Sequence, residues 1–206
     1  MSKLAGKNIL VTGGAGLVGG HLVEKLFSMG AKVFVLDIEV KTKSYFESQK
    51  LQEKAKLIIQ DVRDIAKLKE LILAENISYI FHLAAQALVP LAYEDPVLTL
   101  DTNIMGTVNV LEATRLIPSV KAVIVASSDK AYGKDCKNAT EDHALSGDHP
   151  YDVSKSAADL ICAAYFKTYG VPVTVSRFGN IFGPGDLNFD RIIPGIMKAA
   201  INSEVL

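Results

Sequence analysis

The stretch that most constrains this chain runs from residue 7 to residue 20 and reads KNILVTGGAGLVGG. Its first part, Asn8 to Thr12, is a short apolar run with β-branched residues, which predicts a buried strand. Four glycines follow between positions 13 and 19, and from His21 onward apolar residues recur with a helical period. The residues therefore predict a strand, a glycine turn and a helix, the first half of a nucleotide-binding βαβ unit.

The glycines of this turn suit a backbone that binds pyrophosphate. A tight turn needs a residue that tolerates positive φ, and a phosphate approaches the backbone closely only where no Cβ intervenes. The N-terminus of the following helix offers free N–H groups and the positive end of its dipole. The run matches the pattern G-x-G-x-x-G, and the residues expected to contact the cofactor here are Gly13, Gly14, Ala15, Gly16, Leu17 and Val18.

A carboxylate follows the second apolar run. Asp37 comes directly after residues 31–36 and stands 18 positions after Gly19. The dinucleotide fingerprint places an acid there to accept hydrogen bonds from the adenosine ribose, and its charge would repel a 2′-phosphate. NAD is therefore predicted in preference to NADP, although Lys41 and Lys43 lie just beyond and leave the second cofactor open.

Composition excludes several classes of protein. Of the 206 residues, 49% are hydrophobic, which predicts one domain with a large core, or one domain and the start of another. The net charge of −1 predicts no basic surface for binding nucleic acid or an anionic membrane. No apolar run reaches the ~20 residues that span a bilayer. The first residues enter a strand directly, so no signal peptide is expected and the location is predicted to be cytoplasmic. Cys136 and Cys162 would then be free thiols, and no Cys/His spacing predicts a metal.

Strand and helix patterns alternate along the rest of the chain. Apolar runs predict strands over residues 56–60, 77–83, 121–126 and 171–177. Long helices are predicted from residue 95 or 96 to residue 116 and over 150–169. Such alternation predicts a parallel sheet that is covered on both faces. The fold class is therefore α/β, a doubly wound Rossmann fold with strand order 3-2-1-4-5-6, with a further strand left open.

Two later loops extend the predicted cofactor site. Asp61 and Val62 follow the third strand, where an acid in this fold class can reach the adenine amino group; a plain turn residue is the alternative for Asp61. Leu83 ends the fourth strand, and Ala84 and Ala85 follow it; the two alanines are small enough to let a cofactor approach.

Two stretches after the predicted strand at 121–126 carry chemistry, SSDKAYG and YDVSK. Tyr151 and Lys155 are one helical turn apart and share a face. An ammonium near a phenol is expected to lower the tyrosine pKa from ~10, so that Tyr151 could take a proton from a sugar hydroxyl as hydride leaves for nicotinamide. Y-x-x-x-K alone is common on surface helices, but the glycine turn, Asp37 and a serine at the strand end favour the catalytic interpretation.

Taken together, these motifs resemble the extended short-chain dehydrogenases/reductases, in the NAD-dependent sugar-nucleotide epimerase/dehydratase family. TGGAGLVG, HLAA, TNIMGTVNVLEA, SSDKAYG, HPYDVSK and RFGNIFGPGD occur in the family's order and cover essentially the whole chain. The resemblance implies a catalytic triad of Ser128, Tyr151 and Lys155, with Tyr151 and Lys155 also at the cofactor. It implies substrate contacts from Gln86, Ser128, Asn180 and Arg191; a loop-stabilising amide is the alternative for Asn180.

Within that family the motifs look most like the CDP-glucose 4,6-dehydratase group. Dehydratases place an acid and a base directly after the serine or threonine, which here are Asp129 and Lys130, whereas epimerases usually have small or neutral residues and dTDP-glucose enzymes have Asp-Glu. The resemblance implies C4 oxidation, loss of water across C5–C6 and hydride return to C6, with Lys130 as base if its pKa is lowered and Asp129 as acid if burial raises its pKa. A 4-epimerase, a solvated pair at 129–130 and a non-catalytic NAD-binding module remain alternatives.

The resemblance also implies a domain division and partners. Family members typically continue well past this point, so residues 1–180 are expected to form the NAD-binding Rossmann domain and residues 181–206 the beginning of a shortened sugar-nucleotide lobe. The expected partners are a nucleotide-diphosphate sugar and a second copy of the chain. The two long helices carry apolar residues on more than one face, including Leu160, Ile161, Ala164 and Tyr165, which predicts a four-helix dimer contact unless the stripe faces the sheet.

Overall fold

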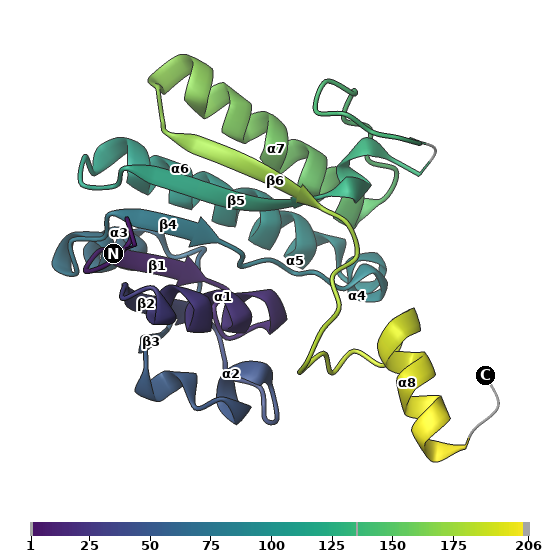
Figure 1. Ribbon diagram of the computed structural model, residues 1–206. Coiled ribbons are helices and arrows are strands. Elements are labelled where there is room, and N and C mark those ends of the chain that lie inside the picture. Colours follow the sequence, from purple (N-terminus) through teal and green to yellow (C-terminus); the bar gives the residue numbers. More distant parts are fainter. Residues whose placement is uncertain (1, 135, 204–206) are drawn as a thin grey trace.

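The protein, described here by a computed structural model over residues 2–134 and 136–203, is built around one parallel sheet (Figure 1). Its six strands lie in the order β3-β2-β1-β4-β5-β6, and each strand pairs in parallel with its neighbours. The doubly wound α/β fold and its strand order are therefore confirmed. The strands are β1 (Asn8–Thr12), β2 (Lys32–Asp37), β3 (Lys56–Ile59), β4 (Tyr79–His82), β5 (Ala122–Ser128) and β6 (Val173–Phe178).

The helices follow the predicted alternation, with two differences of detail. The helix predicted over 96–116 is divided by a π-helical turn, because α5 and α6 flank the turn η2, and Asp95 caps α5 by accepting the N–H of Leu98 at 2.9 Å. The short helix α4 was not predicted. The helical elements are α1 (Leu17–Ser28), α2 (Tyr45–Ser48), η1 (Leu51–Glu53), α3 (Ile65–Ala74), α4 (Val89–Glu94), α5 (Pro96–Leu100), η2 (Asp101–Met105), α6 (Gly106–Leu116), η3 (Asp129–Tyr132), α7 (Pro150–Tyr169) and α8 (Ile192–Asn202).

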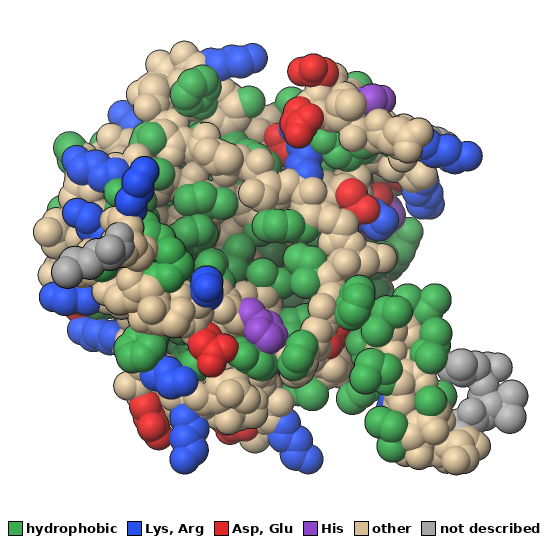
Figure 2. Space-filling view, in the orientation of Figure 1, with side chains coloured by type: hydrophobic (Ala, Val, Ile, Leu, Met, Phe, Trp, Pro, Cys, Tyr) green, Lys and Arg blue, Asp and Glu red, His purple; other side chains and the backbone are tan. Residues whose placement is uncertain are grey.

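Two hydrophobic cores lie on opposite faces of the sheet. On one face, buried residues of α3, α6 and α7 pack against β1, β2, β4 and β5. On the other face, α1 and α2 pack against β1 and β2, while Phe81 of β4 and Ile124 of β5 stay partly exposed. Figure 2 shows hydrophobic side chains across the middle of this second face. The prediction of a sheet covered on both faces therefore holds for β1 and β2 but is wrong for the β5–β6 side.

The segment after β6 leaves the sheet and ends in α8, which stands away from the strands (Figure 1). This helix is strongly apolar and much of its surface is exposed, as Figure 2 shows; its exposed large hydrophobic residues are Ile192, Ile193, Ile196, Met197 and Ile201. Across the described part of the chain, no helix combines the length and the apolar character needed to cross a membrane.

Candidate functional site

The glycine turn between β1 and α1 is packed so tightly that side chains would not fit. Gly13 has a φ of 69°, and a Cβ on it would lie 2.6 Å from the backbone nitrogen of Ala84. A Cβ on Gly14 would lie 2.8 Å from Cγ1 of Val35, and one on Gly19 would collide with the carbonyl oxygen of Gly13. The turn therefore brings β1, α1 and the loop after β4 into backbone contact at the carboxyl edge of the sheet.

The N-terminus of α1 and Asp37 form the two ends of this cradle. Gly16 is the N-cap and carries no capping side chain, so the first-turn N–H groups have no intrahelical partner. The Asp37 carboxylate accepts the N–H groups of Ala15 and Ile38, each at 2.9 Å, and burial raises its pKa. A carboxylate can accept about four hydrogen bonds, so Asp37 retains capacity for hydroxyl groups. Bare backbone, free N–H groups and a carboxylate are the donors and acceptors that a dinucleotide requires.

Asp61 and Val62 lie beside this cradle, and Asp61 is already paired. Arg63 donates to both Asp61 carboxylate oxygens, at 2.7 Å for the shortest contact, and to Asp101 at 2.9 Å. The hydrogen bonds from Arg63 lower the pKa of Asp61. Val62 is buried against Gly106 of α6. Contact of Asp61 with adenine remains a prediction.

A buried histidine links the turn to α6. The Nδ1 atom of His82 lies 2.8 Å from the Thr12 hydroxyl, and its Nε2 atom lies 3.1 Å from the Thr107 hydroxyl. Thr107 donates to the carbonyl of Asn103 at 2.7 Å, so Nε2 of His82 must be the donor to Thr107 and Nδ1 the acceptor from Thr12. Burial lowers the pKa of His82 to about 3, which keeps the ring neutral. The N–H of Ala84 also reaches Thr12, at 3.3 Å.

Asn103, in the π turn η2, connects the loop after β4 to α7. Its side-chain oxygen accepts the N–H of Gln86 at 2.8 Å, and its amide group donates to the Gln86 carbonyl at 3.0 Å and to the Ser154 hydroxyl at 2.9 Å. Ser154 donates in turn to the carbonyl of Tyr151 at 2.6 Å. Asn103 was not among the predicted site residues. The asparagine within TNIMGTVNV was the available signal, but the π turn that orients it was not visible in the sequence.

Tyr151 and Lys155 lie on one face of α7 beside the end of β5. Lys155 is 8% exposed, its ammonium donates to the Ala126 carbonyl at 3.0 Å, and burial lowers its pKa to about 8. The ammonium nitrogen is 6.0 Å from the centre of the Tyr151 ring. Burial raises the pKa of Tyr151, and a hydrogen bond with Ser128 only partly opposes it. The predicted lowering of the tyrosine pKa is therefore wrong here, because desolvation of the phenol raises the pKa more than the hydrogen bond with Ser128 and the charge of Arg191 lower it.

Ser128, Asp129 and Lys130 follow one another at the end of β5 and the start of η3. The Ser128 hydroxyl donates to Asp129 at 3.2 Å and accepts the N–H of Lys130 at 3.2 Å. The charged groups of Asp129 and Lys130 are 3.7 Å apart, and their side chains are 46% and 45% exposed. The burial on which the acid role of Asp129 depends is therefore missing, because nearly half of its side chain is exposed.

The predicted substrate residues are arranged along the same edge. The Gln86 amide donates to the carbonyl of Leu88 in its own loop at 3.0 Å and to the hydroxyl of Thr99 in α5 at 2.8 Å, so its side chain is held between the loop and that helix. Asn180 is exposed just after β6, and Arg191 donates to the carbonyl of Ile181 at 3.0 Å at the start of α8. No group of three His, Cys, Asp or Glu residues within 2–134 and 136–203 could hold a metal ion. Whether these residues bind substrate remains a prediction.

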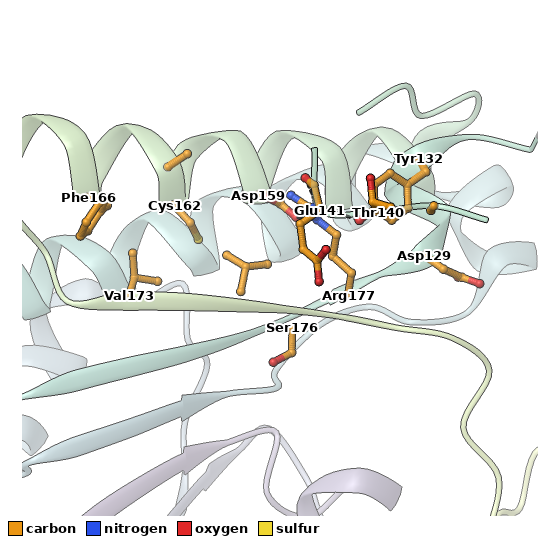
Figure 3. Close-up of a pocket in the computed structure, with 13 residues that line it drawn as sticks. Asp129, Tyr132, Thr140, Glu141, Asp159, Cys162, Phe166, Val173, Ser176 and Arg177 are labelled. Atoms are coloured by element: carbon orange, nitrogen blue, oxygen red, sulfur yellow. Dashed lines mark hydrogen bonds and ion pairs between the residues drawn. The ribbon is translucent and has the colours of Figure 1, made fainter. Parts of the chain in front are cut away.

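A groove of about 650 Å³ lies between α7 and β6, away from the glycine turn (Figure 3). Arg177 crosses it and donates to both carboxylate oxygens of Asp159 on α7, at 2.7 and 3.0 Å. The same guanidinium donates to the Tyr132 hydroxyl at 2.7 Å and to the Glu141 carbonyl at 3.0 Å. Arg177, which was not among the predicted site residues, thus connects η3, with Asp129 and Lys130, to the helix that carries Tyr151 and Lys155.

Comparison with known proteins establishes the family. A family described as GDP-mannose 4,6 dehydratase matches residues 10–205. The chain belongs to this family. The CDP-glucose 4,6-dehydratase of Salmonella typhimurium is 36% identical over 212 residues, which cover 97% of this chain and 59% of that protein.

Solved structures of related enzymes share the architecture of this GDP-mannose 4,6-dehydratase family member. The dTDP-glucose 4,6-dehydratase of Bacillus anthracis in complex with NAD has a TM-score of 0.82 at 29% identity, covering 96% of this chain and 62% of the other. The UDP-glucose 4-epimerase of Thermotoga maritima with UDP-glucose has a TM-score of 0.87 at 29% identity, covering 97% and 64%. The predicted resemblance to sugar-nucleotide dehydratases and epimerases is confirmed, and the chain spans about three-fifths of these relatives' lengths.

Proposed function

We propose that this chain forms the cofactor-binding part of an NAD-dependent sugar-nucleotide 4,6-dehydratase. Residues 1–180 would be the NAD-binding domain and residues 181–206 the beginning of the sugar-nucleotide lobe. The observation that carries the proposal is the gathering of Ser128, Tyr151 and Lys155 at the sheet edge that also holds the glycine turn, with Asp129 and Lys130 directly after the serine. The CDP-glucose and dTDP-glucose 4,6-dehydratases among its relatives support the same reaction class.

NAD fits the residues of the cradle. The pyrophosphate would meet the N–H groups at the start of α1, the adenosine ribose would meet Asp37, and the nicotinamide ribose would meet Lys155. Replacing Asp37 by alanine should relax the preference for NAD, because it removes both the ribose hydrogen bonds and the repulsion of a 2′-phosphate. Calorimetric titration with both cofactors tests this. Tighter binding of NADP than of NAD by the unmodified chain would contradict the assignment.

The proposed reaction needs proton transfers at two places on the sugar, at C4 and at C5–C6, and different residues would carry out each. Tyr151 would take the proton of the C4 hydroxyl, with Ser128 holding that hydroxyl by a hydrogen bond. Since burial raises the pKa of Tyr151, the step depends on the positive charge of Lys155 to favour the phenolate. NAD, when bound, supplies the acceptor for the C4 hydride and returns it to C6. Lys130 would take the C5 proton and Asp129 would protonate the leaving C6 hydroxyl, both beside Ser128.

Mass spectrometry of the product tests the dehydratase reaction. This chain joined to a complete sugar-nucleotide lobe, incubated with NAD and a CDP- or UDP-sugar, should yield a nucleotide sugar that has lost one water. Lys130→Ala should retain NAD binding and C4 oxidation but slow water loss by ~10²–10⁴-fold, the usual cost of losing a positioned proton-transfer group. Lys134→Ala, which changes an exposed lysine of the same segment, serves as the matched control and should eliminate water at the normal rate.

A 4-epimerase is the second candidate, and the exposure of Asp129 and Lys130 favours it. An epimerase needs no acid–base pair at C5 and C6, and UDP-glucose 4-epimerases are among the similar structures. A product inverted at C4 without loss of water would replace the dehydratase assignment by this one. NAD binding without any turnover would instead favour a non-catalytic NAD-binding module.

The proposal includes a homodimer and a cytoplasmic location. Exposed apolar side chains on α5 and α7, at Val97 (74%), Leu160 (60%) and Phe166 (58%), support a four-helix contact between two copies. Ile161 and Tyr165 instead pack toward the sheet core. Light scattering at micromolar concentration should give a dimer that Leu160→Glu dissociates; a monomeric unmodified chain would rule out the dimer.

The unpaired thiols of Cys136 and Cys162 are compatible with a reducing compartment, which supports the proposed cytoplasmic location.

A further inference from the structure

The segment of residues 179–186, here called the strap, runs across the carboxyl edge of the sheet. It leaves β6 at Phe178 and reaches α1 and α2 at Pro184 and Gly185 (Figure 1). Three strand spacings, about 14 Å, separate β6 from β1, and six residues span ~20 Å at most when extended. The strap therefore has little slack. It passes the ends of β5, β4 and β1, where Lys155 and the glycine turn lie.

A tight turn holds the far end of the strap in a defined shape. The N–H of Asp186 donates to the carbonyl of Gly183 at 3.1 Å, Pro184 occupies the second position, and Gly185 occupies the third with a φ of 82°. Proline followed by a glycine with positive φ is the signature of a type II turn. The turn directs the Pro184 carbonyl at α1, where the Nε2 atom of His21 lies 3.0 Å away.

The turn rests on an aromatic platform. The ring of Tyr45 stacks on the ring of His21 with centroids 3.6 Å apart, and the Tyr45 hydroxyl donates to Glu24 of α1 at 2.6 Å. Gly185 sits directly against Tyr45, because a Cβ on Gly185 would lie 2.7 Å from Cβ and 3.1 Å from Cα of Tyr45. The strap thus meets α1 through a hydrogen bond with His21 and α2 through a close contact with Tyr45, and both depend on residues that the catalytic steps do not use.

We propose that the strap, held on His21 and Tyr45, retains the bound dinucleotide and sets the rate at which it leaves. The proposal rests on the cofactor assignment made above. The pyrophosphate would sit on the first turn of α1, and His21 is about one helical turn further along the same helix. The dinucleotide would then lie between the sheet edge and the strap, and could leave only when the turn at 183–186 lifts from α1. His21, Tyr45 and Gly185 are therefore positioning residues for the cofactor.

Gly185→Ala tests the close contact, and Gly183→Ala is its matched control in the same turn. Alanine at 185 must adopt positive φ and push into Tyr45, whereas nothing lies within 4 Å of a Cβ at 183. NADH is bound to each protein and displaced by excess NAD in a stopped-flow instrument that follows NADH fluorescence. Release should be about tenfold faster from Gly185→Ala, given the usual cost of a strained backbone position, and unchanged for Gly183→Ala.

His21→Ala provides a second variant that introduces no clash. It removes the donor to the Pro184 carbonyl, so release should be about two- to tenfold faster, the range expected for one hydrogen bond. Association should not slow in either variant, since an open strap leaves the cradle intact. NADH binding with unchanged release from both Gly185→Ala and His21→Ala, or slower association as their main effect, overturns the strap proposal alone. Failure of the unmodified chain to bind NADH overturns the cofactor assignment together with it.

Discussion

Replacing Lys155 by methionine should stabilise the fold at neutral pH while removing the proposed catalytic charge. The ammonium of Lys155 is buried in α7, with the Ala126 carbonyl at 3.0 Å as its hydrogen-bond acceptor, and burial lowers its pKa to about 8 from an ordinary value of 10.5. A group held charged at pH 7 against such a shift costs folding free energy. Methionine has a similar length and carries no charge, so it removes that cost.

The size of the effect follows from the pKa of Lys155. A shift from 10.5 to about 8 corresponds to about 3 kcal/mol of unfolding free energy. Methionine leaves the Ala126 carbonyl without its donor, which costs ~1 kcal/mol, so the net gain at pH 7 should be about 2 kcal/mol. Below pH 8 the lysine is protonated in both states and its full cost is present. Between pH 8 and 10.5 the unfolded chain binds more protons, so stability rises with pH and the advantage of methionine shrinks.

Urea unfolding, followed by circular dichroism at several pH values from about 7 to about 10, measures both the gain and its pH dependence. Lys167→Met is the control, because Lys167 is exposed near the end of the same helix and its replacement should leave the pH profile of the unmodified chain unchanged. A Lys155→Met chain that is less stable than the unmodified chain at pH 7, or that shows the same pH dependence, would refute the argument from burial.

Three further predictions concern other residues of the cradle and its supports. Gly13→Ala should abolish dinucleotide binding in calorimetric titration. Gly6→Ala, at a position with a similar φ of 71° but open space around its Cβ, should bind the dinucleotide normally. Equal dinucleotide binding by the two variants would contradict the packing argument. Arg177→Met should lower the free energy of unfolding by ~3 kcal/mol, because it leaves a buried carboxylate without its positive partner. Arg115→Met removes one partner of an exposed ion pair and should lower the free energy of unfolding by under ~1 kcal/mol in the same urea assay. His82, with a pKa of about 3, should show no NMR titration between about pH 5 and 8. The free energy of unfolding should fall by up to ~1.4 kcal/mol per pH unit below pH 6.5, because there only the unfolded chain gains the proton. An NMR titration midpoint near 6.5 would contradict the burial of His82.

Local patterns predicted most of the fold. The order and kind of the strands follow from short apolar runs, and α7 was predicted at its observed bounds because Pro150 opens it and Gly170, with a φ of 66°, ends it. Strand order was predicted from the doubly wound Rossmann fold that the glycine turn and the alternation of strands and helices indicate. The break in the helix over 96–116 escaped prediction, because a π turn follows from packing and not from residue type.

The candidate site was predicted less completely. Sequence motifs identified Ser128, Tyr151 and Lys155, and in the structure these residues lie on adjacent elements, β5 and α7. Their electrostatics depended on burial, which no motif reports, and so the pKa of Tyr151 is raised where a lowered value was predicted. Asn103 and Arg177 were missed for a related reason, since each acts through partners that are distant in the chain.

The sequence by itself determined what this chain could become: a glycine turn between strand and helix, an acid after the second strand, and a tyrosine and lysine one helical turn apart. These features depend on neighbours a few residues away in the chain, so they can be recognised without knowledge of the fold. Only the tertiary structure decided which groups are buried and which distant segments meet. The contact between His21 and Pro184, 163 positions apart, is of that kind, because it exists only once β6 has paired with β5 and the strap has crossed the sheet edge.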